Sequence, residues 1–148
     1  MRTYRRLRGR RRAATAVEFA ICASVLVMVM FAIIEFSRLL QIQHAVRQAA
    51  LEGARTGITL DATTASTAAQ ATNILSMVGI TNPTITVTAT AADGSTSTSS
   101  LAYASTGVSV TVSVDPAGNS WYKYFLPAGT PLQATVSLER EVNAISVP

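Results

Sequence analysis

The sequence predicts an α+β protein in which one long amino-terminal helix precedes a small domain with one short helix and a roughly three-stranded antiparallel sheet. Two observations carry this prediction. Residues 13–34 form an apolar run that is interrupted only by Thr15, Glu18 and Ser24. After residue 80, apolar residues recur at every second position, as on strands that are buried on one face. The 148 residues therefore divide into a helical anchor and one modest domain.

The apolar run has the length of a membrane-spanning helix, because about 22 helical residues extend roughly 33 Å. Seven arginines precede the run, at positions 2, 5, 6, 8, 10, 11 and 12. Positive charge is retained on the cytoplasmic side of a membrane, so we expect a cytoplasmic amino terminus and a carboxyl-terminal part outside the cytoplasm. The same arginines are seven of the 12 basic residues, and the rest of the chain is mildly acidic, so the net charge of +4 does not indicate nucleic-acid binding.

The helix is predicted to continue beyond the membrane to about Gly57. Its apolar residues recur there at spacings of three and four, at Leu39, Ile42, Val46, Ala49 and Ala50. Glu35 and Arg38, and likewise Glu52 and Arg55, are spaced for weak ion pairs. A secretory signal peptide is disfavoured, because the run is long and no small-residue cleavage site follows it. The predicted parts are a basic leader at 1–13, a helix at 14–57 (membrane part 14–34, extension 35–57) and a head at 58–148.

Within the head, residues 61–80 are predicted to form a helix with one apolar face, made of Ala68, Ala71, Ile74, Leu75 and Val78. Alternating apolar residues predict strands at 84–90, 107–114 and 131–142, the last with its parity broken by Arg140. The polar segment 91–100 is predicted to be a flexible connection.

The connection at 115–131 concentrates aromatic side chains between turn residues, namely Trp121, Tyr122, Tyr124 and Phe125. One interpretation is that these rings cover the open side of a thin sheet. The other is that they form a docking patch for a partner, since exposed aromatic clusters often anchor interfaces. The sequence leaves both open.

No pattern of catalytic residues occurs. His44 is the only histidine and falls on the polar side of the helix, without a second metal-ligating residue nearby. Cys22 is the only cysteine and lies inside the apolar run, where it is expected to pack as a small hydrophobe. We therefore expect no enzyme, no metal, no cofactor and no small-molecule substrate.

Glu18 is the one acidic residue inside the apolar run, and no basic side chain lies three or four residues from it. In one interpretation it reaches headgroups or water near the cytoplasmic interface. In the other it is a functional group that requires a partner. Cleavage after Ala13 would make Ala14 the amino terminus and Glu18 the fifth residue, so the α-amine of a neighbouring subunit could pair with the carboxylate. Such a contact is heterologous and can propagate as an open helix.

Three segments in this order, AATAVEFAI at 13–21, IIEFSRLL at 33–40 and QAALEGAR at 48–55, resemble the TadE-like family, the pilin-like minor subunits of the tight-adherence (Tad) pilus machinery. The resemblance covers roughly residues 10–57. It implies a bacterial inner-membrane protein whose leader a prepilin peptidase removes between Ala13 and Ala14. It also implies that Glu18 is the glutamate used in assembly, and that other pilin-like subunits and Tad secretion components are partners.

The resemblance further assigns two motifs: a membrane-exit motif of Glu35, Phe36 and Arg38, and a helix-end motif of Glu52, Gly53, Ala54 and Arg55. One position departs from the family pattern, because these leaders usually end in glycine and Ala13 stands there. The sequence therefore predicts a minor pilin or pseudopilin that takes part in assembly of an adhesion pilus. The alternative is an uncleaved single-pass anchor that presents a binding domain outside the cytoplasm.

Overall fold

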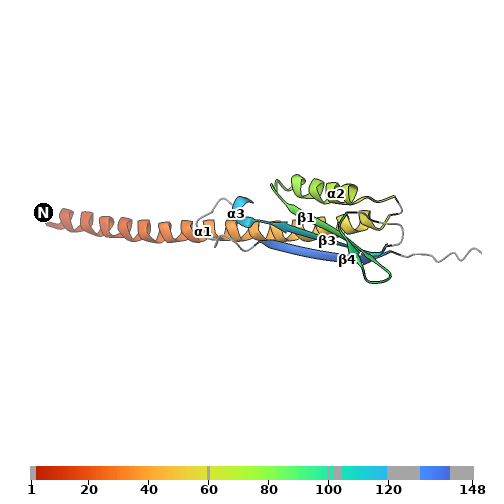
Figure 1. Cartoon of the computed structure of the whole chain (residues 1–148). Coiled ribbons are helices and arrows are strands. Elements are labelled where there is room, and N and C mark those ends of the chain that lie inside the picture. Colours follow the sequence, from red (N-terminus) through yellow and green to blue (C-terminus); the bar gives the residue numbers. More distant parts are fainter. Residues whose placement is uncertain (1–2, 60, 100, 102–104, 120–130, 141–148) are drawn as a thin grey trace, which may run out of the picture. The chain divides into compact units, whose positions relative to one another are not determined.

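The computed structural model describes residues 3–59, 61–99, 101, 105–119 and 131–140, with side chains from residue 13 onward except that of Ser105. Its elements are α1 (Thr3–Gly57), α2 (Thr64–Met77), β1 (Thr84–Ala91), β2 (Thr96–Ser97), β3 (Ser105–Val114), α3 (Pro116–Asn119) and β4 (Leu132–Glu139) (Figure 1). The predicted α+β class, with a long apolar helix followed by a small domain, is confirmed. Contacts divide the chain into two compact units, residues 1–37 and 38–148, so the second half of α1 belongs to the same unit as the sheet. From here on, the head means this second unit, residues 38–148.

The sheet has four antiparallel-paired strands in the order β2-β1-β3-β4. Strands β1, β3 and β4 are the three that alternation predicts. Strand β2 was not predicted, because its two residues lie in a Ser- and Thr-rich segment without apolar alternation. It pairs with the end of β1 in a hairpin, where segment 91–100 was predicted to be a flexible connection. The turn of this hairpin contains Gly94, whose φ of +81° is a conformation that L side chains rarely adopt.

The inner face of the sheet carries the core. Valines at alternate positions of β3 are at most 1% exposed, at Val108, Val110, Val112 and Val114. Register places Val87 of β1 and Val136 of β4 on either side of Val110, so apolar side chains form rows across the sheet. The outer face carries the intervening residues, which are mostly threonine and serine. Hydroxyl pairs bridge β3 and β4 there, from Thr111 to Thr135 at 2.9 Å and from Ser137 to Ser109 at 3.1 Å.

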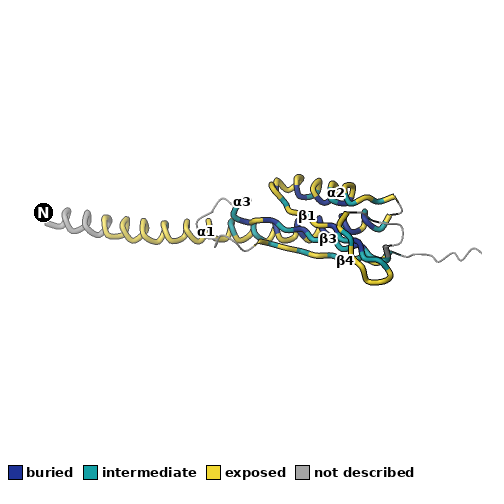
Figure 2. The backbone as a smooth tube through the Cα atoms, in the orientation of Figure 1, coloured by how far each residue is buried: buried dark blue, intermediate teal, exposed yellow. Residues whose placement is uncertain are grey.

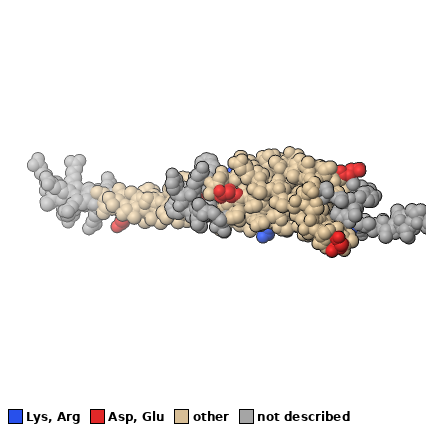
Figure 3. Space-filling view, in the orientation of Figure 1, with Lys and Arg blue, Asp and Glu red and all other residues tan. Residues whose placement is uncertain are grey.

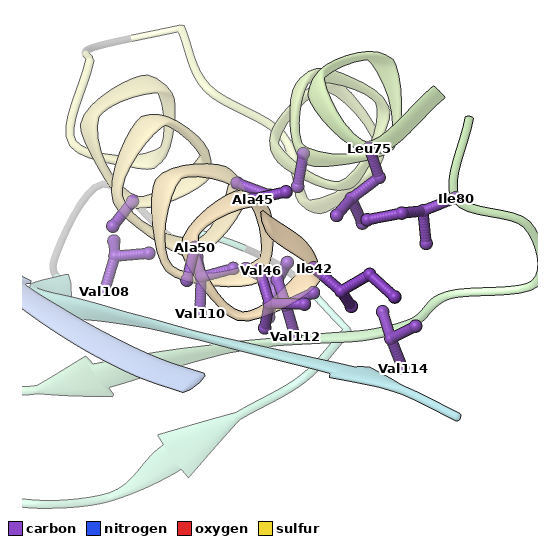
Figure 4. Packing of buried hydrophobic residues seen from close by; sticks show 14 residues of the cluster. Ile42, Ala45, Val46, Ala50, Leu75, Ile80, Val108, Val110, Val112 and Val114 are labelled. Atoms are coloured by element: carbon purple, nitrogen blue, oxygen red, sulfur yellow. The ribbon is translucent and has the colours of Figure 1, made fainter. Parts of the chain in front are cut away.

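The second half of α1 packs against this inner face through small residues (Figure 4). A Cβ atom on Gly53 would lie 3.3 Å from Val110 Cγ1 and 3.4 Å from Ala71 Cβ of α2. A Cβ atom on Gly57 would lie only 2.7 Å from Val108 Cγ1. Because Ala49, Ala50 and Ala54 are also fully buried, the helix, the sheet and α2 approach one another closely along this stretch.

Helix α2 begins with a capping box that the sequence of its first turn supplies. The Thr63 hydroxyl accepts from Ser66 N–H, and the Ser66 hydroxyl accepts from Thr63 N–H, both at 3.0 Å. Of its predicted apolar face, Ala71 and Leu75 are fully buried and Ala68 and Ile74 are partly buried. Val78 is 42% exposed, and the buried position that the periodicity missed is Thr67, whose hydroxyl has no hydrogen-bond partner.

Arg140, which breaks the alternation of the last strand, closes the carboxyl end of α1. Its Nη2 donates to the carbonyl oxygens of Gly57 and Thr59 at 2.9 Å, and its Nε donates to that of Ile58 at 3.2 Å. The last carbonyls of a helix have no partner within the helix and carry partial negative charge, so a guanidinium there is favourable. The side chain that looked like an interruption of a strand is therefore a helix cap.

Candidate functional site

The membrane segment presents apolar side chains all around α1. Every residue from 13 to 34 is exposed except Ala23, which is partly buried, and Phe19 and Met28 are more than 70% exposed (Figure 2). The stretch is long and apolar enough to cross a membrane, and no part of its most apolar window is buried by the described protein. The core helix of a soluble protein would be largely covered. An uncovered apolar cylinder instead fits contact with lipid or with other helices.

Glu18 is the only acidic side chain on this cylinder, and it is exposed. Ala14 and Cys22 lie one turn before and after it, on the same face of the helix. Within the described residues, Arg55 and Glu52 form the only ion pair, so the carboxylate of Glu18 is not neutralised by a basic side chain. A charged group in hydrocarbon is costly unless it is paired or reaches water, and the chain itself offers no basic partner within a turn.

The three residues of the membrane-exit motif lie in different environments. Phe36 is 63% exposed, whereas Glu35 is partly buried, with an Oε1 atom that has no hydrogen-bond partner. The ion pair expected between Glu35 and Arg38 is not formed. Arg38 Nε instead donates to the carbonyl oxygen of Asn119, at 3.0 Å. A spacing of three residues brings the side chains of Glu35 and Arg38 within reach of each other, but the guanidinium donates to the carbonyl at the end of α3 instead.

Asn119 connects three segments at this end of the head. Its Oδ1 accepts from the backbone N–H of Thr81 at 2.7 Å, and its Nδ2 donates to the carbonyl oxygens of Asp115 and Thr81 at 3.0 and 3.2 Å. Together with the bond from Arg38, these contacts tie α1, α3 and the segment before β1 to one another. Sequence reasoning missed Asn119, because the sequence marks 115–131 only as a connection and a helix as short as α3 has no periodicity that would indicate a partner.

The helix-end motif divides into a charged part and a packing part. Glu52 Oε1 accepts from Arg55 Nη1 and from Gln48 Nε2, both at 3.0 Å, which confirms the predicted pair of Glu52 and Arg55. Gly53 and Ala54 are buried against the sheet and α2. The motif therefore serves the close packing of the head.

Other predicted positions carry less information. His44 is exposed, as its place on the polar side of the helix predicts. Among the described side chains, no group of three or more His, Cys, Asp or Glu residues could hold a metal ion. The aromatic residues Trp121, Tyr122, Tyr124 and Phe125 lie outside the described residues, so their two interpretations both stay open.

Comparison with known proteins gives one match. The family model described as TadE-like protein matches residues 13–55, which include Glu18, the membrane-exit motif and the helix-end motif. No curated protein and no solved structure shows a significant similarity to the chain. The match confirms the resemblance seen in the sequence: residues 13–55 are similar to the TadE-like family, and the long apolar helix fits a single-pass membrane protein of a pilus system.

Proposed function

We propose that this protein is a structural minor pilin or pseudopilin that takes part in assembly of a Tad adhesion pilus, and that it is not an enzyme. The observation that carries the proposal is Glu18, a carboxylate on an otherwise apolar and uncovered helix surface, within the segment that matches the family. A membrane anchor alone has no need of this residue. A subunit that packs its helix against other helices can use it to select one contact.

The proposed assembly begins with removal of the basic leader by a prepilin peptidase at the cytoplasmic face of the bacterial inner membrane. Cleavage between Ala13 and Ala14 leaves an α-amine one helical turn from Glu18. In an assembly, the carboxylate of one subunit accepts the amine of its neighbour, while the head remains outside the cytoplasm. Because the carboxylate of each subunit pairs with the amine of the next, one group stays unpaired at either end of the row, and the contact can repeat from subunit to subunit without closing.

The energetics favour pairing over an unpaired charge. Once packed helices exclude water and lipid headgroups, an uncompensated carboxylate costs about 3–5 kcal/mol when its partner is removed. Glu18→Gln should therefore leave membrane insertion intact, since it makes the helix less polar, and should remove the subunit from the assembled fraction. The partners that the proposal requires are other pilin-like subunits and Tad secretion components.

The experiment that tests the proposal is co-expression with a Tad-type prepilin peptidase, followed by mass spectrometry of the membrane-bound product. The expected amino terminus is Ala14. Glu18→Gln is then compared with Glu52→Gln, which removes a carboxylate from the head. We expect only the first to abolish recovery with other pilin-like subunits. A terminus beyond Ile34, or assembly that is insensitive to Glu18→Gln, would overturn the proposal.

The alternative function, an uncleaved anchor that presents a binding domain, is favoured by two observations. Ala13 stands where these leaders usually end in glycine, and α1 continues without a break from Thr3 through the expected cleavage site. Ala13→Gly distinguishes the two. If the wild-type chain keeps its leader while Ala13→Gly is cut, the single methyl group blocks the peptidase and the anchor is the native form. If both chains are cut, the alternative is excluded.

A further inference from the structure

The described sheet ends in two strand edges that have no hydrogen-bonding partner over most of their length. Among the described residues, strand β4 pairs only with β3, so its other edge has no described partner along all eight residues. Within the same residues, strand β1 pairs with β2 only at Ala89 and Thr90, which leaves the edge from Thr84 to Thr88 without a described partner. A row of unpaired N–H and C=O groups is a template for another strand.

Most of each open edge lacks the features that usually prevent edge pairing. No Lys, Arg, Asp, Glu or Pro occurs at 84–88 or at 132–138, and β4 follows β3 in regular register over its full length. The one charged residue of β4 is Glu139, at its last position, and the face shown in Figure 3 is mostly uncharged. Over these residues, both edges therefore present backbone groups without a described partner and side chains without charge, which suits pairing with another strand.

The two edges also match each other in the side chains that they would bring together. Helices α1 and α2 pack chiefly over β3 and β1, so the apolar residues on the inner side of β4 are only partly buried. These residues are Leu132, Ala134, Val136 and Leu138. The inner residues of β1 are also apolar. On the outer side, Thr84, Thr86 and Thr88 of β1 would adjoin Gln133, Thr135 and Ser137 of β4, continuing the rows of hydroxyl groups.

The direction of the strands determines which strand of a neighbouring copy can pair with the β4 edge. Strands β1 and β4 are both antiparallel to β3 and hence parallel to each other. Both run from the Arg38 end of the head, where Thr81 and Asn119 lie, to the Gly57 end, where Arg140 caps α1. In each chain Arg38 follows shortly after the apolar segment at 13–34, so copies anchored in one membrane emerge from it in the same chain direction. Antiparallel pairing of two β4 edges would invert one copy, whereas pairing of β4 with β1 keeps both in the same orientation.

We propose that the heads of neighbouring copies associate edge to edge, with β4 of one copy adding in parallel to β1 of the next. The contact is heterologous, so it leaves one β1 edge and one β4 edge free at the ends of each row and can extend. It requires only co-oriented copies in one membrane. Leader cleavage and the pairing of Glu18 are not needed, so this inference can fail while the proposed function stands.

Cysteine cross-linking in membranes without a peptidase tests the contact, in a Cys22→Ser background that removes the only native cysteine. Thr86→Cys is co-expressed, under a second tag, with Gln133→Cys, Thr135→Cys or Ser137→Cys, which cover three registers on the same exposed side of β4. Within one chain, Thr86 and Thr135 both lie opposite Thr111. They are thus separated by two strand spacings of roughly 4.8 Å, beyond the reach of a disulfide.

We expect a disulfide-linked mixed dimer for at least one of the three pairs, and little or none when each single variant is expressed alone. A chain that carries both cysteines of that pair should form a ladder of species larger than the dimer. Thr111→Cys, on the same face but on the central strand, is the matched control and should not cross-link. Absence of the mixed dimer in all three pairs would overturn the proposal. So would a β4 variant that cross-links to itself as readily as to Thr86→Cys.

Discussion

Ile33 and Ile42 lie on the same helix, yet the first is 61% exposed and the second is 1% exposed. The difference extends to the two halves of α1. Residues 13–34 present apolar side chains on all sides, whereas residues 38–57 bury a stripe and expose polar residues such as His44 and Arg47 (Figure 2). An all-round apolar surface fits lipid, and a one-sided stripe fits a domain core. One continuous helix therefore has a first half whose surface suits lipid and a second half whose buried stripe suits a domain core.

The largest expected effect comes from the same substitution made in each half. Ile42→Ala leaves a cavity between α1, α2 and the sheet and should lower the free energy of unfolding of the head by about 2–5 kcal/mol. Ile33→Ala removes an equal side chain from the uncovered surface and should leave the stability of the head unchanged. Pulse proteolysis in urea, on protein in detergent micelles, measures both. Equal destabilisation by the two variants would contradict the division of α1.

The next effect sharpens the comparison, because close packing is confined to the second half. Gly57→Ala places a methyl group against the stiff side chain of Val108 and should cost about 1–3 kcal/mol of head stability. Gly53→Ala meets Val110 at 3.3 Å, and the better helix propensity of alanine, about 1 kcal/mol, offsets much of the strain. Gly118→Ala meets nothing within 4 Å and is the control. The same unfolding assay ranks the three, and Gly57→Ala should stand apart.

A smaller effect is expected where the second half of α1 ends. Arg140→Met removes three hydrogen bonds to carbonyls at and just beyond the carboxyl end of α1, together with a charge that complements the helix dipole, and should cost about 1–2 kcal/mol. Arg140→Lys keeps the charge but loses the planar fork, so its loss should be intermediate. Hydrogen exchange of the amides near Gly57 reports on fraying directly. Unchanged protection in Arg140→Met would show that the cap is dispensable.

Periodicity alone predicts the elements whose side chains are buried on one face. The valines of β3 and the apolar stripe of α1 are visible in the sequence because burial on one side imposes a period of two or 3.6. The roles of Arg140 and Asn119 are not visible. Each uses a polar side chain to satisfy carbonyls that are distant in sequence, and such pairing has no period. Strand β2 and helix α3 are too short for any pattern to emerge.

The candidate site was predictable to a similar extent and for a similar reason. Glu18 stands out because an acidic residue contrasts with an apolar run, and composition alone shows that contrast. In the uncleaved chain α1 already begins at Thr3, since arginine is a good helix former and no proline interrupts residues 3–13. The boundary between the leader at 1–13 and the helix at 14–57 stays a prediction. The destination of Arg38 depends on where α3 ends in space, so no rule of local spacing could identify it.

The smallest expected effect lies in the hairpin of β1 and β2, where polar hydrogen bonds alone order a turn. Two groups of Ser95 donate hydrogen bonds to the carboxylate of Asp93, the side-chain hydroxyl and the backbone N–H. Both lower the pKa of the Asp93 carboxyl group from its ordinary value of 3.8, and the hydroxyl has the larger effect. Because this carboxyl pKa is lower in the folded than in the unfolded state, the ionised carboxylate stabilises the turn at pH values above the unfolded-state pKa. The contribution is lost as the pH falls through the folded-state pKa. Exchange of the amide of Ser95 should accelerate, relative to other exposed amides, only below about pH 4. In Asp93→Ala, which removes the acceptor of both hydrogen bonds, the acceleration should already be present at neutral pH and should lose this dependence. If the amide of Ser95 stays protected at neutral pH in Asp93→Ala, the turn is held by its backbone conformation at Gly94 and not by the carboxylate.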